Sequence, residues 1–241
     1  MTTINIQPIE KRIVSDGESL DVHSIFLTIQ GEGPFTGRRA IFVRLAGCNL
    51  QCPGCDTDYT NDRVKMSVAD ILRTVREERN SLKGMVGLNP LVVITGGEPL
   101  RQTLEPLLLD LAINGFSVQV ETNGTLGIES KNLLAWAGVT IVCSPKAGKV
   151  HPSIHTLANC FKYVLQHNSV SPVDGLPILA LSHSAAPQVA RPLAARVPIY
   201  LQPMDEKDDV ANTMNQKAVL ESCLKYGYVL QLQVHKLLNV E

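Results

Sequence analysis

Three cysteines lie within eight residues of this chain, at Cys48, Cys52 and Cys55. Thiolates this close together repel one another and oxidise readily unless a soft metal centre binds them. An iron–sulfur cube has four irons, so three cysteines leave one iron without a protein ligand, and a small molecule could coordinate there and be reduced. The spacing C-x3-C-x2-C therefore predicts a [4Fe–4S] cluster with an open corner.

A structural zinc site is the main alternative for the same residues. Such a site takes four ligands, usually as two pairs of Cys or His, and no second pair exists here. The remaining cysteines, Cys143, Cys160 and Cys223, are isolated in apolar surroundings, which is typical of small core residues. A disulfide framework is also disfavoured, because the chain is long and we expect no secretory leader. The open cluster is favoured over zinc.

The composition bounds the class of protein. With 241 residues, 44% of them hydrophobic, the chain can bury a full core in one domain spanning residues 1–241. A net charge of −1 argues against direct nucleic-acid binding. No window of eighteen uninterrupted apolar residues occurs, so no membrane span is expected. We expect a cytoplasmic protein, in a reducing compartment that suits both free thiols and an iron–sulfur cluster.

β-rich runs alternate with helical patterns along the chain. This alternation predicts an α/β fold with a parallel sheet and right-handed crossovers, a partial or modified TIM-like (β/α) barrel of six to eight strands that is open or closed. The expected strands are residues 24–29, 41–45, 91–94, 117–121, 139–143, 161–165, 178–181, 199–201 and 229–233. The expected helices are residues 67–79, 101–114, 128–136, 187–196 and 215–226.

Polar signatures recur directly after the expected strands. They are residues 30–32, 48–58, 95–98, 144–146 and 202–205. The carboxyl ends of parallel strands form the active face of α/β folds, so all five groups can line one pocket. This clustering predicts an enzyme.

Several of these groups also have plain structural interpretations. The glycines of Thr95-Gly96-Gly97-Glu98-Pro99 could serve only a tight turn, or could expose backbone to a ligand, while Pro99 favours an extended Glu98. Arg44, inside an apolar strand, is either a structural ion pair or an anion clamp. The turn after Cys55 contains Thr57, whose hydroxyl could join a Mg2+ sphere completed by a substrate carboxylate. Lys146 is a solvated loop charge or an anion contact.

The cysteine triplet, with the Gly-Gly-Glu motif some forty residues downstream, resembles the radical S-adenosylmethionine superfamily. The resemblance implies that the open iron binds the amino and carboxylate groups of S-adenosylmethionine. It also implies that one electron then cleaves the sulfonium and yields an adenosyl radical. The protein's part is to position and shield that radical.

Motifs across the chain resemble one family more narrowly, the 7-carboxy-7-deazaguanine synthases. They are residues 29–33, 44–50, 55–58, 95–99, 121–124, 144–146, 202–205 and 235–239. The resemblance implies conversion of 6-carboxy-5,6,7,8-tetrahydropterin to 7-carboxy-7-deazaguanine with loss of ammonia, in the 7-deazapurine (queuosine) pathway. It further implies Mg2+, a pterin substrate, an electron donor such as flavodoxin or ferredoxin, and a homodimer.

The same resemblance assigns roles to individual residues. Cys48, Cys52 and Cys55 bind the cluster and Thr57 binds Mg2+. The residues expected to contact S-adenosylmethionine are Gly54, Cys55, Asp56, Gly97, Ser144, Pro145, Lys146, Gln202, Pro203, Met204 and Asp205. Those expected to contact the pterin are Ile29, Gln30, Gly31, Arg44, Thr95 and Glu241. Within the single domain, residues 1–23 form an N-terminal extension, 47–66 the cluster-binding loop and 234–241 a tail that closes the substrate pocket.

Two other functions share part of this evidence. An activase that installs a glycyl radical on a partner protein has the same triplet and a similar glycine motif, but does not need Arg44, Thr57 or an ordered carboxyl tail. A zinc-stabilised binding module without catalytic activity is the second. Activity on free pterin separates the first from a pterin enzyme, and colour separates the second, since iron–sulfur proteins are brown and zinc proteins colourless.

Overall fold

The computed structural model describes residues 5–55, 57–81, 84, 87, 89–128, 136–180, 188–194 and 196–240. One sheet of nine strands organises this part of the chain, in the order β3-β1-β2-β4-β5-β6-β7-β8-β9. The strands are β1 (Ser19–Ile29), β2 (Arg39–Leu45), β3 (Val64–Ser67), β4 (Leu91–Gly96), β5 (Val118–Thr122), β6 (Val139–Cys143), β7 (Cys160–Leu165), β8 (Ile199–Pro203) and β9 (Val229–Leu230). β3 and β9 are the two edge strands, and among the described residues they do not pair with each other. The sheet is therefore an open, partial barrel.

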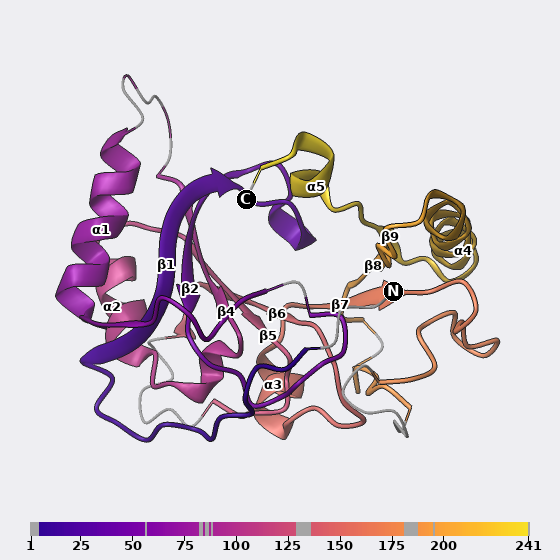
Figure 1. The fold of residues 1–241 in the computed structure, drawn as a ribbon, viewed down its shortest axis with the longest axis horizontal. Coiled ribbons are helices and arrows are strands. Elements are labelled where there is room, and N and C mark those ends of the chain that lie inside the picture. Colours follow the sequence, from indigo (N-terminus) through magenta and orange to yellow (C-terminus); the bar gives the residue numbers. More distant parts are fainter. Residues whose placement is uncertain are drawn as a thin grey trace.

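Helices and short turns connect the strands (Figure 1). They are the 3-10 turns η1 (Gly33–Phe35) and η2 (Pro99–Arg101) and the helices α1 (Val68–Ser81), α2 (Glu105–Ile113), α3 (Pro152–Leu157), α4 (Asp209–Tyr226) and α5 (Val234–Leu238). Figure 1 shows α1 and α2 beside the β1 end of the sheet and α4 beside the β8–β9 end. No helix in the described ranges is long and apolar enough to cross a bilayer.

Pairing within the sheet corrects one expectation. From β2 to β9 every pair is parallel, as the β–α alternation predicted. β1, however, runs antiparallel to both β2 and β3. The connection from β1 to β2 spans only residues 30–38, and a parallel connection needs a crossover of a dozen residues or more. A fully parallel sheet was therefore the wrong expectation at this edge.

The segment between β7 and β8 holds two further corrections. The strand expected at residues 178–181 is absent from its described part, where Leu179 forms only an isolated bridge with Gln188. The helix expected at 187–196 is absent from residues 188–194 and 196. Arg191 instead binds the Asp174 carboxylate and donates hydrogen bonds to the Pro177 and Val189 carbonyls, so its side chain ties this stretch to residues 174–177. The helix expected at 128–136 lies almost entirely outside the described residues.

The remaining expected elements are confirmed, with shifted ends. Three short elements, β3, α3 and α5, had no prediction. The α2 helix begins later than expected because Pro99–Arg101 forms a separate 3-10 turn.

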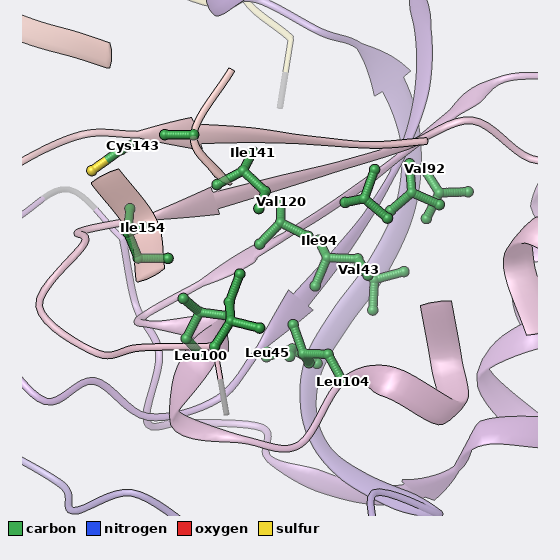
Figure 2. Close-up of a cluster of buried hydrophobic side chains, with 14 of the residues drawn as sticks. Val43, Leu45, Val92, Ile94, Leu100, Leu104, Val120, Ile141, Cys143 and Ile154 are labelled. Carbon is green, nitrogen blue, oxygen red and sulfur yellow. The ribbon is translucent and has the colours of Figure 1, made fainter. Parts of the chain in front are cut away.

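The main core lies between the sheet and its helices. Figure 2 shows apolar side chains from neighbouring strands in a row, with Leu100 and Leu104 packed against them. The row contains Val43, Leu45, Val92, Ile94, Val120, Ile141 and Cys143. Side chains alternate across a strand, so the neighbours of these residues face the opposite, concave side of the sheet. Those neighbours include Arg44, Thr95, Glu121 and, on β7, Lys162.

Candidate active site

The cysteine loop follows β2 directly and holds three thiols. Cys48 is buried, and Cys52 and Cys55 are half-buried. The Cys55 N–H donates to the Cys52 carbonyl at 3.4 Å, and the Leu50 N–H donates to the Cys48 sulfur at 3.5 Å. Burial raises the pKa of the Cys48 thiol to about 12, so a cationic centre is needed to keep it as a thiolate.

The donor set of the cysteine loop is three thiols. Among the described residues no three His, Cys, Asp or Glu side chains are placed to hold one metal ion. A cubane offers a different iron to each of three thiolates, so their sulfurs need not converge on one point. Three soft thiolate donors on one loop suit an iron–sulfur cluster that keeps one iron open.

The glycine pair after β4 packs directly against the cysteine loop. A Cβ on Gly97 would lie 2.2 Å from the Gly47 carbonyl oxygen and 2.8 Å from the Cys48 Cβ. Gly96 has a φ of +141°, and a Cβ there would lie 2.0 Å from the Leu45 carbonyl oxygen. Backbone contact at this point requires glycine. Gly97, an expected S-adenosylmethionine contact, thus lies beside a cluster cysteine.

Glu98 of the same motif is a buried structural acid. Its carboxylate accepts hydrogen bonds from the Leu100 N–H at 3.0 Å, the Thr122 hydroxyl at 2.7 Å and the Asn123 N–H at 2.7 Å. Its backbone is extended, as Pro99 predicted. The Asn123 side-chain amide in turn donates to the side-chain oxygen of Asn49, in the cysteine loop, at 2.9 Å. Burial raises the pKa of Glu98 to about 7 despite these donors. Glu98 thus joins the turn after β5 to the cysteine loop.

Arg44 and Thr57 meet beside the cysteine loop. An Arg44 guanidinium nitrogen lies 3.5 Å from the Thr57 hydroxyl, and the guanidinium carbon lies 5.6 Å from the centre of the Phe26 ring. Arg44 is half-buried rather than enclosed. Thr95 is its partner in the register between β2 and β4. A planar cation stacked on an aromatic ring, next to a hydroxyl, suits a carboxylate ligand.

A buried charge cluster lies on the same side of the sheet. The Lys162 ammonium binds the Glu32 carboxylate and lies 3.5 Å from the Glu121 carboxylate. Burial alone would raise the pKa of Glu32, but Lys162 and a hydrogen bond from Gln233 lower it to about 2. Burial opposes the charge of Lys162 too, yet the two carboxylates raise its pKa above the usual value. Glu32 and Lys162 are therefore both charged at neutral pH.

Glutamines extend this cluster to other strand ends. Gln30 donates to Glu121 at 3.1 Å, and Gln202 donates to Glu32 at 3.2 Å. Within the described structure, the Gln119 and Gln202 side-chain carbonyls are buried acceptors without a hydrogen-bond partner. A buried acceptor without a hydrogen bond costs free energy, so these are positions where a bound ligand could donate.

Lys146 follows β6 and is half-buried. Its ammonium donates to the Ser144 hydroxyl at 2.9 Å. Burial is the main reason that its pKa is lowered, and Lys162 adds to the effect, whereas Cys52, Glu32 and Cys55 act in the opposite direction. The charges that influence Lys146 belong to the charge cluster and to the cysteine loop, so it lies near both.

The last expected group, residues 202–205, borders a groove of about 490 Å3. Pro203, Met204 and Asp205 line it together with α4 and the chain beyond β9. Asp205 lies 3.3 Å from Lys236. No cluster cysteine lines the groove, so the metal centre would lie elsewhere.

The carboxyl tail meets the turn after β1. The Val234 N–H donates to the Gly31 carbonyl at 3.2 Å, and a Cβ on Gly31 would lie 2.2 Å from the His235 ring. Ile29 ends β1, and Gly54 is exposed at the tip of the cysteine loop. Pro145 is buried between Ser144 and Lys146. Two expected contacts, Asp56 and Glu241, lie outside the described residues.

The described contacts connect several of the five strand-end groups, which the sequence placed on one face. Glu32 is bonded to Gln202, and Glu98 is connected through Asn123 to Asn49 of the cysteine loop, whereas Lys146 contacts Ser144 of its own group. Sequence reasoning missed Lys162, Gln119 and Gln233, and quoted Glu32 and Glu121 only within motifs. A signal existed for Lys162, since it is a lone charge in the apolar run from Phe161 to Leu165. The same signal identified Arg44.

Comparison with known proteins identifies the family of this chain. Residues 43–159 match the model of the radical SAM superfamily. A 7-carboxy-7-deazaguanine synthase of Rhodospirillum rubrum is 40% identical over 231 residues, which cover 93% of this chain and 94% of the relative. One from Rickettsia prowazekii is 37% identical over 94% of this chain and 91% of the relative. The crystal structure of QueE from Escherichia coli aligns with a TM-score of 0.65 at 28% identity, covering 89% of this chain and 94% of that one. The chain therefore belongs to the 7-carboxy-7-deazaguanine synthase family of radical SAM enzymes.

Proposed function

We propose that this protein converts 6-carboxy-5,6,7,8-tetrahydropterin to 7-carboxy-7-deazaguanine with loss of ammonia. The observation that carries the proposal is the Arg44–Thr57 pair beside the cysteine loop, 3.5 Å apart. A pterin carboxylate needs a cation, and a hydroxyl can share a Mg2+ ion with that carboxylate. The family membership supports the same reaction.

The chain's own residues divide the work between two ligands. Cys48, Cys52 and Cys55 would hold the [4Fe–4S] cluster. When bound, the cluster and S-adenosylmethionine supply one-electron radical chemistry. The residues that would contact S-adenosylmethionine are Gly54, Asp56, Gly97, Ser144, Pro145, Lys146, Gln202, Pro203, Met204 and Asp205.

The pterin would lie against the concave face between Arg44 and the charge cluster. Arg44 would bind its carboxylate and Thr57 would hold Mg2+. Ile29, Gln30, Gly31, Thr95 and Glu241 complete the proposed contacts. The pterin ring carries several N–H donors, and the buried acceptors of Gln119 and Gln202 lack partners in the described structure. Tight burial of charged and amide groups around a small ligand keeps water from the reacting centre.

An anaerobic assay tests this function. Protein reconstituted with iron and sulfide is supplied with S-adenosylmethionine, dithionite, Mg2+ and 6-carboxytetrahydropterin, and the product is followed by mass. We expect 7-carboxy-7-deazaguanine, none from Cys52→Ala, and less when Mg2+ is withheld. Cys223→Ala is the matched control, because Cys223 is a free thiol buried in the main core. Cleavage of S-adenosylmethionine without deazaguanine would overturn the substrate and favour a glycyl-radical activase.

We propose three further properties of the working enzyme. It acts in the cytoplasm, takes electrons from a flavodoxin or ferredoxin, and forms a homodimer. Exposed apolar side chains support the last: Val229 and Leu230 on the edge strand β9 are 43% and 46% exposed, and Leu237 on α5 is 71% exposed. Light scattering should give twice the chain mass, and Leu230→Glu should shift it towards the monomer. A wild-type monomer at micromolar concentration would contradict the dimer.

A further inference from the structure

The N-terminal extension runs across the outside of the cysteine loop. Its residues 5–13 form a continuous ordered segment, named here the N-terminal strap. At the start of the strap Asn5 and Gln7 are half-buried, whereas Ile6 between them is 84% exposed. Ile9 is 61% exposed. Since Ile6 and Ile9 face solvent, their burial does not explain why this part of the strap lies here.

Polar contacts hold the strap to the loop, and Gln7 makes the central ones. Its side-chain amide donates to the Thr57 carbonyl at 2.9 Å, and its side-chain oxygen accepts the Tyr59 N–H at 2.8 Å. The Gln7 main-chain carbonyl accepts the Gln51 amide at 2.7 Å. The Thr60 hydroxyl also donates to the Gln7 side-chain oxygen, at 3.3 Å. One residue thus contacts the cysteine loop at four points, on both sides of the cysteines at positions 52 and 55.

Asn5 reinforces this arrangement. Its amide donates to the Cys52 carbonyl at 3.1 Å and to the Tyr59 hydroxyl at 3.3 Å. Its side-chain oxygen accepts the Gln7 N–H at 3.0 Å, which fixes Gln7 in turn. Tyr59 is itself buried, with 1% of its surface exposed. The two amides therefore clamp the loop around a buried tyrosine.

The far end of the strap is anchored beneath Cys48. The Glu10 N–H donates to the Cys48 carbonyl at 2.7 Å. The Glu10 carboxylate binds Arg63 and lies 3.3 Å from Arg101, which is 2% exposed. Arg101 donates to the Lys11 carbonyl at 3.0 Å and to the Ala46 carbonyl at 3.0 Å. A buried guanidinium thus fixes the strap to the start of the same loop.

We propose that Gln7 is a positioning residue for the cluster and magnesium sites, and that the strap keeps the cysteine loop closed over the cluster. The inference rests on the proposed function for the identity of these sites. The strap's contacts to Cys52 and Thr57 are made through the main-chain carbonyls of these residues. Loop opening is the route by which a chelator reaches a cluster, and the strap's hydrogen bonds oppose it.

Gln7→Ala tests the proposal, with Ile6→Ala as the matched control on the opposite side of the strap. The Gln7 side chain bonds to the loop at Thr57, Tyr59 and Thr60. Loss of the two shorter bonds, to Thr57 and Tyr59, each worth about 1 kcal/mol or roughly fivefold, should increase loop opening by about 25-fold. We expect iron release to a chelator from reconstituted full-length protein to accelerate by about that factor. Hydrogen exchange of residues 48–60 should accelerate with it. The Mg2+ concentration for half-maximal activity should rise by a larger factor than the factor by which kcat falls. Ile6→Ala should match the wild type in all three.

Two further variants keep the test decisive. Gln7→Glu retains the acceptor for Tyr59 but loses the donor to Thr57, so its iron release should lie between wild type and Gln7→Ala. Asn5→Ala should act in the same direction, and the double variant should be less than additive because Asn5 supports Gln7. If Gln7→Ala does not fold, these two variants decide.

Exchange and iron release within twofold of the wild type would overturn the proposal. Faster exchange with unchanged iron release would overturn the role at the cluster, leaving the strap a loop clamp only. A wild type that binds no cluster would overturn the proposed function instead, and exchange at residues 48–60 would still decide whether the strap holds the loop.

Discussion

The ionisation of Glu98 should make the stability of this protein depend on pH. The carboxyl is fully buried and its pKa is raised from 4.5 to about 7, with burial as the main cause. Below pH 4.5 both the folded and the unfolded chain carry a neutral acid, so no stability is lost. As the pH rises the unfolded chain ionises first, and folded stability falls until the pH passes about 7.

Glu98→Gln removes this effect without changing the shape of the side chain. A neutral amide resembles the protonated acid. Both lack the carboxylate oxygen to which the Asn123 N–H donates. Linkage gives a cost to the wild type of about 1 kcal/mol at pH 5 and about 3 kcal/mol at pH 8. The variant should therefore gain about 2 kcal/mol relative to the wild type between these pH values.

Urea unfolding of full-length protein without its cluster, from pH 5 to pH 8, measures the difference. Glu77→Gln on the exposed side of α1 is the control, and its difference from the wild type should stay within about 0.5 kcal/mol. The Glu98→Gln protein should also retain its cluster less well, because the ionised Glu98 holds Asn123 towards the cysteine loop. Parallel pH profiles for wild type and Glu98→Gln would refute the reasoning.

Three further predictions concern the site. Gly97→Ala should push the cysteine loop aside at a cost of about 1–3 kcal/mol and lower the iron bound per chain, whereas Gly138→Ala, where a Cβ would meet no atom within 4 Å, should keep the iron content of the wild type. Lys162→Met should cost about 3–5 kcal/mol at pH 8 in urea unfolding, because it removes the ion-pair partner of the half-buried Glu32 and Glu121 carboxylates. The loss should be smaller at pH 5, because burial then raises the pKa of Glu32 without Lys162 to oppose it; equal losses would contradict this. Arg44→Lys should raise KM for the pterin about tenfold or more, with a smaller change in kcat, because a lysine lacks the planar fork of the guanidinium. Thr57→Val should raise the Mg2+ concentration that activity requires. Unchanged kinetic constants would show that neither residue belongs to the substrate site.

The sequence predicted the parts of the fold that depend on local pattern. The strands from β2 to β8 are short apolar runs bounded by turn residues, and such a run by itself indicates a buried strand. The antiparallel β1 could not be distinguished because strand direction depends on the partner and not on composition. The segment 187–196 has helix-favouring alanines, yet the predicted helix is absent from its described residues. Arg191 bonds instead to Asp174 and to nearby carbonyls, a tertiary contact that helix propensity does not take into account.

The candidate site divides in the same way. The cysteines, the glycine pair and Arg44 carry their chemistry in their own type and spacing. Lys162 offered a readable signal, a charge inside an apolar strand. Gln7 offered none, since an amide in an N-terminal segment acquires meaning only when the fold brings it to the loop at residues 51–59.

The central claim is that the three thiols hold a cluster with an open iron. Low-temperature electron paramagnetic resonance of the reconstituted, dithionite-reduced protein, with and without S-adenosylmethionine, tests it most directly. The account predicts the signal of a reduced [4Fe–4S] cluster whose g values change when S-adenosylmethionine is added, and no such signal in Cys52→Ala. A colourless zinc protein, or a cluster signal that S-adenosylmethionine leaves unchanged, would contradict it.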